Sequence, residues 1–379
     1  MKDKPRILFY LIHLLGIGHL QRILAVTDEL LHAGAEVCIL STGGPATILQ
    51  QSRATVFTLP TVSIRDHDFS TLYSISGGAM SASDWGRRIR AIDTQLRSFR
   101  PQVLVTEMYP FGRRKFHREI RQMLESAAGL NPPPVVVASV RDIIQGNRKD
   151  DHYREMARVV RDCYDHVLVH GDPVFIPFDL SFPYTDDVAN RISYTGYVSG
   201  NRPVSSMVAE PVDVLVSTGG SEVGERLIRC CLDVSRQPLM ANYRWCIRTS
   251  LWAKIHATQT IPSHVRVEAL DDDFIALLGQ ARISISQGGY NTMVDLLQSH
   301  TPAVVVPFEG SGETEQRQRA EKLSVDGQLV VLLENDLDAE SLLVAMQRAG
   351  TLDTGKRLRP MVDGARQSAD RLLQWANLS

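Results

Sequence analysis

Short apolar runs alternate with segments whose apolar residues recur every three or four positions along almost the whole chain. The first pattern predicts buried β-strands and the second predicts amphipathic helices, so the alternation indicates an α/β fold with parallel sheets. The predicted strands lie at 6–13, 36–40, 55–58, 102–106, 135–140, 166–169, 191–194, 212–217, 243–248, 265–268, 282–286, 303–306 and 329–332. The predicted helices lie at 20–32, 83–99, 115–127, 151–164, 222–235, 273–280, 290–299, 315–323, 339–350 and 363–375.

Residues 196–211 interrupt this alternation, because they are rich in Gly, Ser, Asn and Pro and lack periodicity. Such a segment is typical of a linker, and 379 residues are enough for two domains. We therefore predict Rossmann-like domains at 1–199 and 200–358, followed by a helix within 359–379. A second irregular stretch, 60–80, predicts a long loop whose apolar side chains either touch a ligand or pin the loop down.

Three predicted strands end in a glycine turn that leads directly into a helix. The turns are Gly16-Ile17-Gly18-His19, Ser217-Thr218-Gly219-Gly220-Ser221 and Gln287-Gly288-Gly289. Glycine lets a ligand approach the backbone, and a helix N-terminus presents unpaired N–H groups and a positive dipole to phosphate. Asp295 follows the third turn by about one helical turn, where a carboxylate can accept hydrogen bonds from a ribose. One early and two late turns predict two nucleotide-binding folds that face each other.

These turns resemble the glycine motifs of MurG-like glycosyltransferases. Residues 302–308 and 313–318 extend the resemblance, and residues 108–115 are similar to a stretch of the predicted glycosyltransferase subgroup related to MurG. The resemblance implies a GT-B fold, in which two Rossmann-like domains face each other across a cleft and the last helix crosses back to the N-terminal domain. It also implies a hexosyltransferase that moves a hexose or N-acetylhexosamine from a nucleotide sugar, with UDP the expected nucleotide, and inverts the anomeric carbon.

The resemblance places the nucleotide-sugar donor in the C-terminal domain. It implies that the two late glycine turns hold the diphosphate and sugar, that Asp295 binds the ribose and that the base lies against residues 269–270. Glu315 and Gln316 would bind sugar hydroxyls, with a solvated helix start as the alternative interpretation. The implied donor-binding residues are Ser217, Thr218, Gly219, Gly220, Ser221, Leu270, Gln287, Gly288, Gly289, Asn291, Thr292, Asp295, Glu315 and Gln316. Arg248 ends a predicted strand and could meet a phosphate, but we expect it to be exposed.

His19 is the expected catalytic residue. A histidine titrates near neutral pH and can take the proton of an attacking hydroxyl, and MurG-like enzymes use a histidine at the matching position. The alternative is a helix N-cap or a core histidine, and we interpret His13, in the first predicted strand, as structural. The expected acceptor-binding residues are Gly16, Gly18, Glu107 and Arg113, with Glu107 as the second candidate base. The cations at 113–115 bind an anionic acceptor or form a solvated helix start.

Composition and charge exclude several other classes. The chain has a formal net charge of −2, so binding to bulk nucleic acid is not indicated. Its five cysteines include no Cys-x-x-Cys pair, so neither a disulfide framework nor a structural zinc is expected, and a reducing cytoplasm fits best. No apolar window reaches the roughly 18 residues of a membrane span, which leaves only peripheral membrane contact open. Lys2 and Lys4 before an apolar run mimic a signal peptide, but the following glycine turn favours a buried strand.

Two Asp-x-Asp strings resemble the paired carboxylates of metal-dependent transferases. They are Asp66-His67-Asp68 and Asp271-Asp272-Asp273. The second string fits a helix N-cap and first turn better, and the first lies in the predicted loop. We therefore expect no metal and no other cofactor.

Two rival functions stay open. A non-hydrolysing UDP-sugar 2-epimerase shares the implied fold, but it needs more acid–base groups around the sugar than these motifs supply. A non-catalytic nucleotide-sugar-binding partner of another transferase is the second rival. The presence of His19 together with Asp295 and Glu315-Gln316 argues against it. The sequence specifies neither the acceptor nor the oligomeric state.

Overall fold

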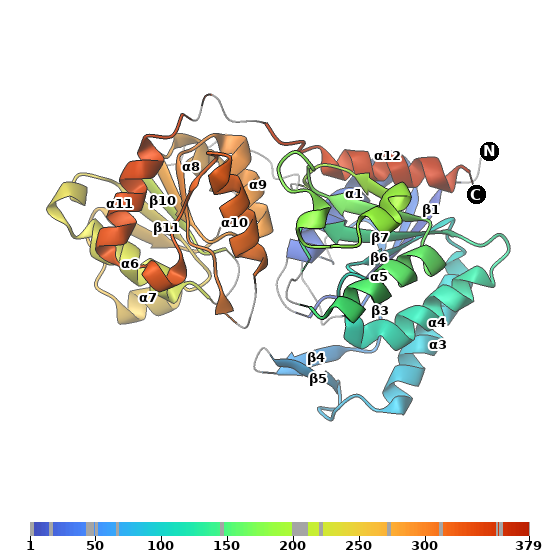
Figure 1. Ribbon diagram of the computed structural model, residues 1–379. Helices are drawn as coiled ribbons and strands as arrows, with labels where there is room; N and C mark the ends of the chain where they lie inside the picture. The colour runs from blue at the N-terminus through green and yellow to red at the C-terminus, as the bar shows by residue number, and fades with distance from the viewer. Residues whose placement is uncertain are drawn as a thin grey trace.

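The fold consists of two parallel β-sheets with helices packed against them, one sheet in each half of the chain (Figure 1). The α/β class with two Rossmann-like halves, predicted from the sequence, is therefore confirmed. The computed structural model describes residues 4–14, 18–42, 49, 52–65, 68–144, 148–198, 211–219, 223–270, 274–310, 314–353, 355 and 359–378.

The first sheet has seven strands in the order β3-β2-β1-β6-β7-β8-β9. Its strands are β1 (Arg6–Leu11), β2 (Glu36–Ser41), β3 (Thr55–Thr58), β6 (Val103–Glu107), β7 (Val135–Arg141), β8 (His166–His170) and β9 (Ile192–Tyr194). Its helices are α1 (Gly18–His32), α3 (Ala82–Phe99), α4 (His117–Ala128) and α5 (Asp150–Cys163), with 3-10 turns η1 (Arg114–Phe116), η2 (Phe178–Leu180) and η3 (Asp186–Arg191).

Side chains of β1 alternate between the two faces of the first sheet, as the period of a strand requires. Leu8 and Tyr10 join the apolar core beneath α3, α4 and α5, whereas Ile7 and Phe9 join the core beneath α1. Because both faces of the sheet are covered, β1 reads as one continuous apolar run in the sequence.

The second sheet has six strands in the order β12-β11-β10-β13-β14-β15. Its strands are β10 (Val214–Ser217), β11 (Trp245–Arg248), β12 (Val265–Glu268), β13 (Ile283–Ser286), β14 (Ala303–Val305) and β15 (Val330–Val331). Its helices are α6 (Glu225–Ser235), α7 (Trp252–Thr258), α8 (Phe274–Gln280), α9 (Tyr290–Ser299), α10 (Glu315–Val325) and α11 (Ala339–Gly350), with 3-10 turns η4 (Pro238–Met240) and η6 (Glu334–Asp336).

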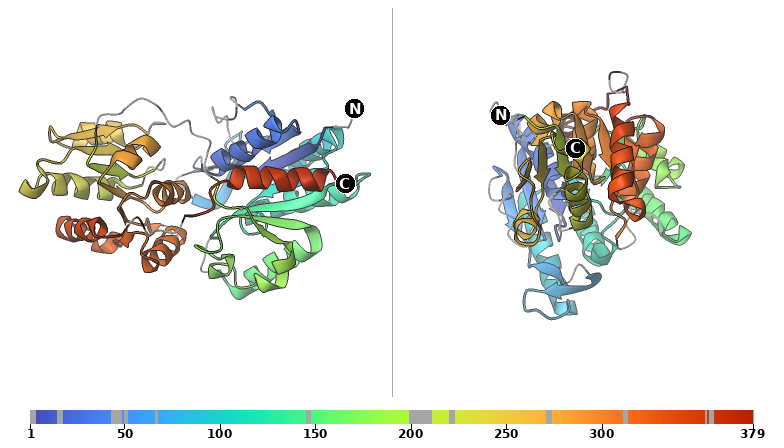
Figure 2. Two further views of the ribbon diagram at one scale, coloured as in Figure 1. Left: turned by 90° about the horizontal axis from the view of Figure 1, so that it is seen from above. Right: turned by 90° about the vertical axis from the view of Figure 1, so that its left-hand side faces the viewer.

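The last helix, α12 (Gly364–Ala376), lies along the first sheet beside α1 (Figure 2). Trp375 stacks on His166 at the start of β8, with ring centroids 3.9 Å apart. Just before α12 the chain runs antiparallel to residues 197–198 at the end of the first half. Tyr197 N donates to Met361 O there at 2.7 Å. Gly364 is required there, because a Cβ at this position would lie 2.4 Å from a backbone oxygen of Gly196.

The segment predicted as a loop at 60–80 contains an antiparallel hairpin, so that prediction was wrong. Its strands are β4 (Val62–Arg65) and β5 (Asp68–Ser74). Leu72 is buried in the first core and Tyr73 stacks with Arg65, whose Cζ lies 4.1 Å from the ring centroid. Ile75, beyond β5, is 81% exposed. Val62–Arg65 does alternate between inner and exposed positions, but four residues are too few for a clear periodic signal.

Three smaller expectations were also wrong. The structure adds α7, which the sequence analysis did not identify. The first strand ends at Leu11, so His13 lies beyond it. Arg248 is only 7% exposed, because its Nη1 donates to Ala269 O at 3.0 Å and its Nη2 lies 3.2 Å from a carboxylate oxygen of Glu268.

Candidate active site at the domain boundary

His19 and Glu107 meet at the carboxyl edge of the first sheet. β1 and β6 are neighbouring parallel strands, so the turn after β1 and the last residue of β6 lie at the same edge. His19, in the first turn of α1, places Nδ1 2.7 Å from Glu107 Oε1. The Glu107 side chain is 1% exposed and that of His19 is 17% exposed, so the imidazole keeps access to an incoming molecule.

The contact with Glu107 fixes the tautomer of His19. A carboxylate accepts only, so Nδ1 carries the proton and donates it to Glu107, which leaves Nε2 free to accept. Arg22 lies one turn further along α1, and its Nη2 donates to the same oxygen of Glu107. Arg22 Nη2 is also 3.3 Å from His19 Nδ1, but a guanidinium cannot accept the Nδ1 proton.

The electrostatic environment keeps His19 neutral and Glu107 ionised. Burial lowers the pKa of His19 to about 4, although the Glu107 carboxylate acts in the opposite direction. Burial would raise the pKa of Glu107, but His19 and the charge of Arg22 outweigh it and hold this pKa at about 2. A neutral imidazole supported by a carboxylate is the arrangement required of a general base.

The loop after β6 turns the three predicted cations in different directions. Met108 and Arg113 both have left-handed backbone conformations, with φ of 65° and 57°. Burial lowers the pKa of Arg113, while Glu107 raises it and Arg141 lowers it further, so this guanidinium lies within the charged cluster around Glu107. Arg114 and Lys115 are exposed. The expected trio therefore divides into one inward and two outward residues.

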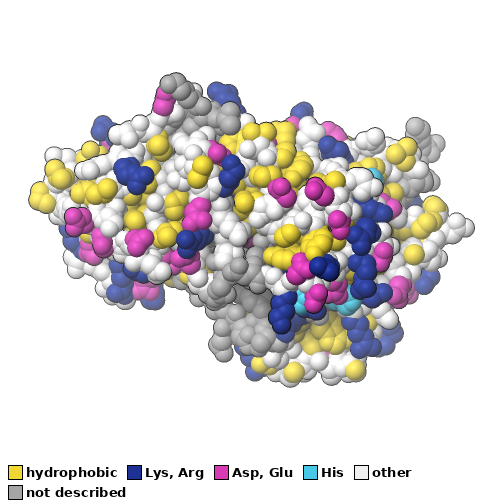
Figure 3. Space-filling model, in the orientation of Figure 1, with side chains coloured by type: hydrophobic (Ala, Val, Ile, Leu, Met, Phe, Trp, Pro, Cys, Tyr) yellow, Lys and Arg dark blue, Asp and Glu magenta, His cyan; other side chains and the backbone are white. Residues whose placement is uncertain are grey.

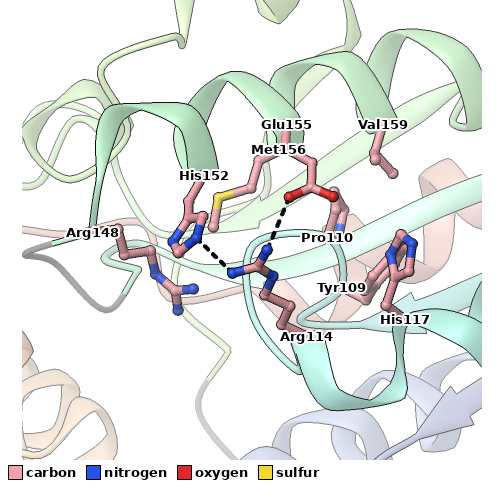
Figure 4. A pocket seen from close by; sticks show the side chains of 9 residues that line it. All are labelled: Tyr109, Pro110, Arg114, His117, Arg148, His152, Glu155, Met156 and Val159. Carbon is pink, nitrogen blue, oxygen red and sulfur yellow. Dashed lines mark hydrogen bonds and ion pairs between the residues drawn. The ribbon is translucent and has the colours of Figure 1, made fainter.

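Arg114 lines a pocket between the loop after β6 and α5 (Figure 4). Its Nη1 lies 2.6 Å from His152 Nε2, and its Nη2 lies 3.6 Å from Glu155 Oε2. Lys, Arg and His side chains gather on this face of the first domain, over α4 and α5 (Figure 3). The pocket is lined by Tyr109, Pro110, Arg114, His117, Arg148, His152, Glu155, Met156 and Val159.

The second sheet brings the two late glycine turns together. β10 and β13 are neighbouring parallel strands, and Gln287 N donates to Ser217 O at 3.2 Å. The Thr218 hydroxyl is 2.8 Å from that of Thr249. Gly224 precedes α6 with φ of 115°, and a Cβ there would lie 2.7 Å from the Thr218 side chain. Glycine is therefore needed at this position, which the sequence analysis had not singled out.

Gly288 and Gln316 also lie close together, because a Cβ on Gly288 would be 3.1 Å from Gln316 O. The Gln316 side chain accepts a hydrogen bond from Phe308 N at 3.2 Å. Gly289 is the N-cap of α9, in which Thr292 is half-buried. These contacts show how the predicted donor residues are held, and their role in binding stays a prediction.

The first turn of α9 faces the other domain. Asn291 Nδ2 donates to Gln21 Oε1 of α1 at 3.0 Å, and a Cβ on Gly18 would lie 3.6 Å from Asn291 Nδ2. Asp295 is 6% exposed and lies four residues beyond Asn291, on the same side of the helix. Leu270, expected at the nucleotide base, is 40% exposed.

A buried ionic network joins the two domains at this boundary. Arg319 on α10 contacts Asp142 at 2.8 Å and Glu315 at 2.9 Å. Arg141, the last residue of β7, contacts Glu315 with Nη2 2.7 Å from Oε2. Glu315, predicted to bind sugar hydroxyls, is therefore held by arginines from both domains, and its pKa is lowered because Arg141 and Arg319 outweigh its burial.

Tyr290 forms a second bridge between the domains. Its hydroxyl donates to His170 O at 2.9 Å and accepts from Val198 N at 3.2 Å. The Cζ atoms of Arg22 and Arg319 lie 5.9 and 5.6 Å from its ring centroid. The residue after the third glycine turn thus packs directly against the first domain.

Several predicted positions lie outside the described residues. They are Gly16, Gly220, Ser221, Asp66, His67, Asp271, Asp272 and Asp273. Within the described part of the chain, no group of three or more His, Cys, Asp and Glu side chains is arranged to hold a metal ion. No described helix is long and apolar enough to cross a membrane.

Four residues of the site were not predicted from the sequence: Arg22, Arg141, Asp142 and Arg319. Weak signals for them exist. Arg22 is three residues after His19 and Arg319 is four residues after Glu315, so each shares a helix face with a predicted residue. Arg141 and Asp142 directly follow the apolar core of β7, at the sheet edge where ligands bind.

Comparison with solved structures agrees with this architecture. The crystal structure of MurG from Acinetobacter baumannii superimposes with a TM-score of 0.61 at 14% identity, over 99% of this chain and 99% of that one. The fold is therefore that of the GT-B glycosyltransferases.

Sequence comparison finds similarity to glycosyltransferases as well. Residues 214–367 match the glycosyltransferase family 28 C-terminal domain. An uncharacterised glycosyltransferase of Methanosarcina acetivorans is 23% identical over 322 residues, 79% of each chain. The UDP-N-acetylglucosamine–N-acetylmuramyl-(pentapeptide) pyrophosphoryl-undecaprenol N-acetylglucosamine transferase of Thermotoga neapolitana is 24% identical over 194 residues, 50% of this chain and 54% of that enzyme. The chain is therefore similar in sequence to MurG-like glycosyltransferases and has the GT-B fold.

Proposed function

We propose that the protein is a metal-independent, inverting transferase that moves a hexose or N-acetylhexosamine from a UDP-sugar to an acceptor hydroxyl. The hydrogen bond between His19 and Glu107 carries the proposal, because it prepares a neutral base beside the donor domain. The UDP-dependent relative from T. neapolitana supports UDP as the nucleotide.

In the proposed reaction, the acceptor oxygen attacks the anomeric carbon as the bond from that carbon to the diphosphate oxygen breaks. The bonding electrons leave with the UDP. The acceptor's proton passes to His19 Nε2, and Glu107 stabilises the resulting imidazolium through Nδ1–H. Attack from the side opposite the leaving group inverts the anomeric configuration.

The donor is proposed to bind the two late glycine turns. The N-terminus of α9 presents N–H groups and a positive dipole beside Gly288 and Gly289, where they can absorb the charge of the leaving diphosphate. Asp295 is proposed to bind the ribose. Glu315 reaches the sugar only if it exchanges contacts with Arg141 and Arg319 for sugar hydroxyls. Peripheral contact with a membrane and location in the cytoplasm stay predictions.

A donor screen followed by a transfer assay tests the proposal. The thermal midpoint of the protein should rise with UDP and with one or more UDP-sugars, since a ligand that binds only the folded state stabilises it. The best donor should then be consumed faster when acceptor hydroxyls are supplied, with the product formed in the inverted configuration.

The same assay without acceptor separates the alternatives. A new UDP-sugar formed from donor alone would identify an epimerase and contradict the proposal. Binding of UDP-sugar without turnover on lipid-linked, small-molecule or polysaccharide acceptors would favour the non-catalytic partner.

A further inference from the structure

Arg113 and Arg141 stand beside the proposed base but have no part in the proposed proton transfer. Arg113 precedes η1 and Arg141 ends β7, so both come from the first domain. Both lower the pKa of His19, whose main perturbation is burial, and they lie within electrostatic reach of the imidazole. Arg141 also contacts Glu315 of the second domain.

Each of these arginines carries a buried nitrogen without a partner. The Nε atoms of Arg113 and Arg141 are buried and make no hydrogen bond within the described structure. The same holds for Nδ1 of His13, whose pKa is lowered by burial and by Arg113. Buried polar atoms are nearly always paired in folded proteins, so unpaired ones on residues within electrostatic reach of one another indicate that something else completes them.

The charges of this cluster are also incompletely balanced. Glu107 pairs with Arg22, and Glu315 and Asp142 pair with Arg141 and Arg319, whereas Arg113 adds a fourth guanidinium within electrostatic reach of Glu107 and His19 stays neutral at neutral pH. The guanidinium groups belong to Arg22, Arg113, Arg141 and Arg319, and the carboxylates to Glu107, Asp142 and Glu315. An excess positive charge in a largely buried position attracts an anion.

The backbone also commits Arg113 to this position. Met108 and Arg113 are both in the left-handed region, which disfavours side chains larger than glycine's, within one six-residue loop. Such conformations persist where the surrounding structure demands them, and they concentrate at functional sites. The loop thus keeps Arg113 within electrostatic reach of Glu107 while Arg114 is exposed.

We propose that Arg113 and Arg141 form a subsite for an anionic group of the acceptor, a carboxylate or phosphate next to the hydroxyl that His19 deprotonates. This inference rests on the proposed transferase function. A planar guanidinium pairs with such an anion through two parallel hydrogen bonds, and the unpaired Nε atoms supply part of that geometry. The acceptor is favoured over the donor because Arg113, Arg141 and His13 all belong to the first domain, opposite the late glycine turns.

Binding of inorganic phosphate in the presence of saturating UDP tests the subsite directly. UDP fills the donor's own phosphate positions, so phosphate that still binds reports a second anion site. We expect calorimetry to show such binding for the wild type and at least a tenfold weakening in R113Q and in R141Q. R118Q removes the same charge from an exposed position on α4 and should bind like the wild type. R113K keeps the charge but loses the paired geometry, so its affinity should be intermediate.

The outcomes distinguish an anionic group of the acceptor from the diphosphate of the donor. If saturating UDP abolishes phosphate binding, the arginines serve the donor diphosphate and the acceptor subsite is overturned. Equal affinity of R113Q and R118Q, with both variants folded by circular dichroism, also overturns it. If UDP fails to bind while phosphate binding still depends on Arg113, the proposed transferase function fails and the anion site stands.

A transfer assay then tests the acceptor class. Two acceptors are compared, one with a carboxylate and one with the corresponding primary amide. The wild type should use the carboxylate acceptor with a kcat/KM at least tenfold higher, mainly through a lower KM. R113Q should lose that preference and keep its donor affinity. Equal use of both acceptors by the wild type contradicts the proposal.

Discussion

Arg319 on α10 donates two hydrogen bonds to Asp142 across the domain boundary, with Nη2 2.8 Å from Oδ1 and Nε 3.0 Å from Oδ2. Both side chains are essentially inaccessible to solvent. Arg319 also donates to Gly288 O, in the turn proposed to hold the donor, at 3.3 Å. One residue therefore fixes both the relative position of the domains and the proposed donor turn.

Removing one member of this pair should destabilise the protein strongly. D142A leaves the Arg319 guanidinium buried with Glu315 as its remaining carboxylate partner. Removing one partner of a buried ion pair generally lowers the free energy of unfolding by about 3–5 kcal/mol. The double variant D142L/R319M should recover part of that loss because it buries no unpaired charge. Urea unfolding measures both. The exposed pair Arg161–Asp187 supplies the control, since D187N should change stability little. An equally small effect of D142A would contradict the interpretation.

H19A should lower kcat by about 10²–10⁴-fold, the usual contribution of a positioned general base. Affinity for the UDP-sugar, measured by calorimetry, should barely change because His19 belongs to the first domain. E107Q should also lower kcat, since it removes the carboxylate that stabilises the imidazolium. H32A, at the exposed end of the same helix, is the matched control. A near-wild-type kcat for H19A would remove His19 from the mechanism.

The sequence predicted most of the fold because the apolar periodicity of buried strands and amphipathic helices is local information. The sequence also located both glycine turns of the second sheet and His19, because glycine and histidine indicate their possible roles by residue type alone. It did not predict the interdomain contacts of Arg141 and Arg319, because an arginine in a sequence looks the same whether it is solvated or buried. Pairing with Asp142 depends on how two separate sheets dock, which no local pattern encodes.

The pH dependence follows from the lowered pKa of His19. The base must be neutral to act, and burial sets its pKa at about 4, so kcat/KM should show no acidic inflection near 6.5 and should fall only as pH approaches about 4. Between about 4 and 6.5 an unfolded chain binds a proton at this histidine that the folded protein does not. Stability should therefore rise with pH across that window.

Rate profiles between pH 4.5 and 8 and urea midpoints over the same range measure these two effects. In H19A the rise in stability with pH should become shallower. An acidic limb at pH 6–7 in the wild-type kcat/KM profile would show that the imidazole is not held in the buried environment described above.

D295A should weaken donor binding far more than it slows chemistry on bound donor. Two hydrogen bonds from ribose hydroxyls to a carboxylate contribute roughly 1.5–3 kcal/mol each, so the Kd for UDP should rise by at least about tenfold. D336A removes a carboxylate from an exposed turn of the same domain and serves as the control. Unchanged calorimetric affinity of D295A for UDP would exclude Asp295 from the donor site.

Activity should survive removal of divalent cations. The proposed mechanism assigns the leaving diphosphate's charge to the N–H groups and dipole at the start of α9, which do the work that a metal ion does in metal-dependent transferases. Turnover measured after dialysis against EDTA should equal that of the untreated enzyme, and added Mg²⁺ or Mn²⁺ should change it little. A large loss in EDTA that either cation restores would contradict metal independence. D271N and D273N would then be compared with D66N and D68N, because these two Asp-x-Asp strings are the carboxylate pairs that the sequence offers as ligands.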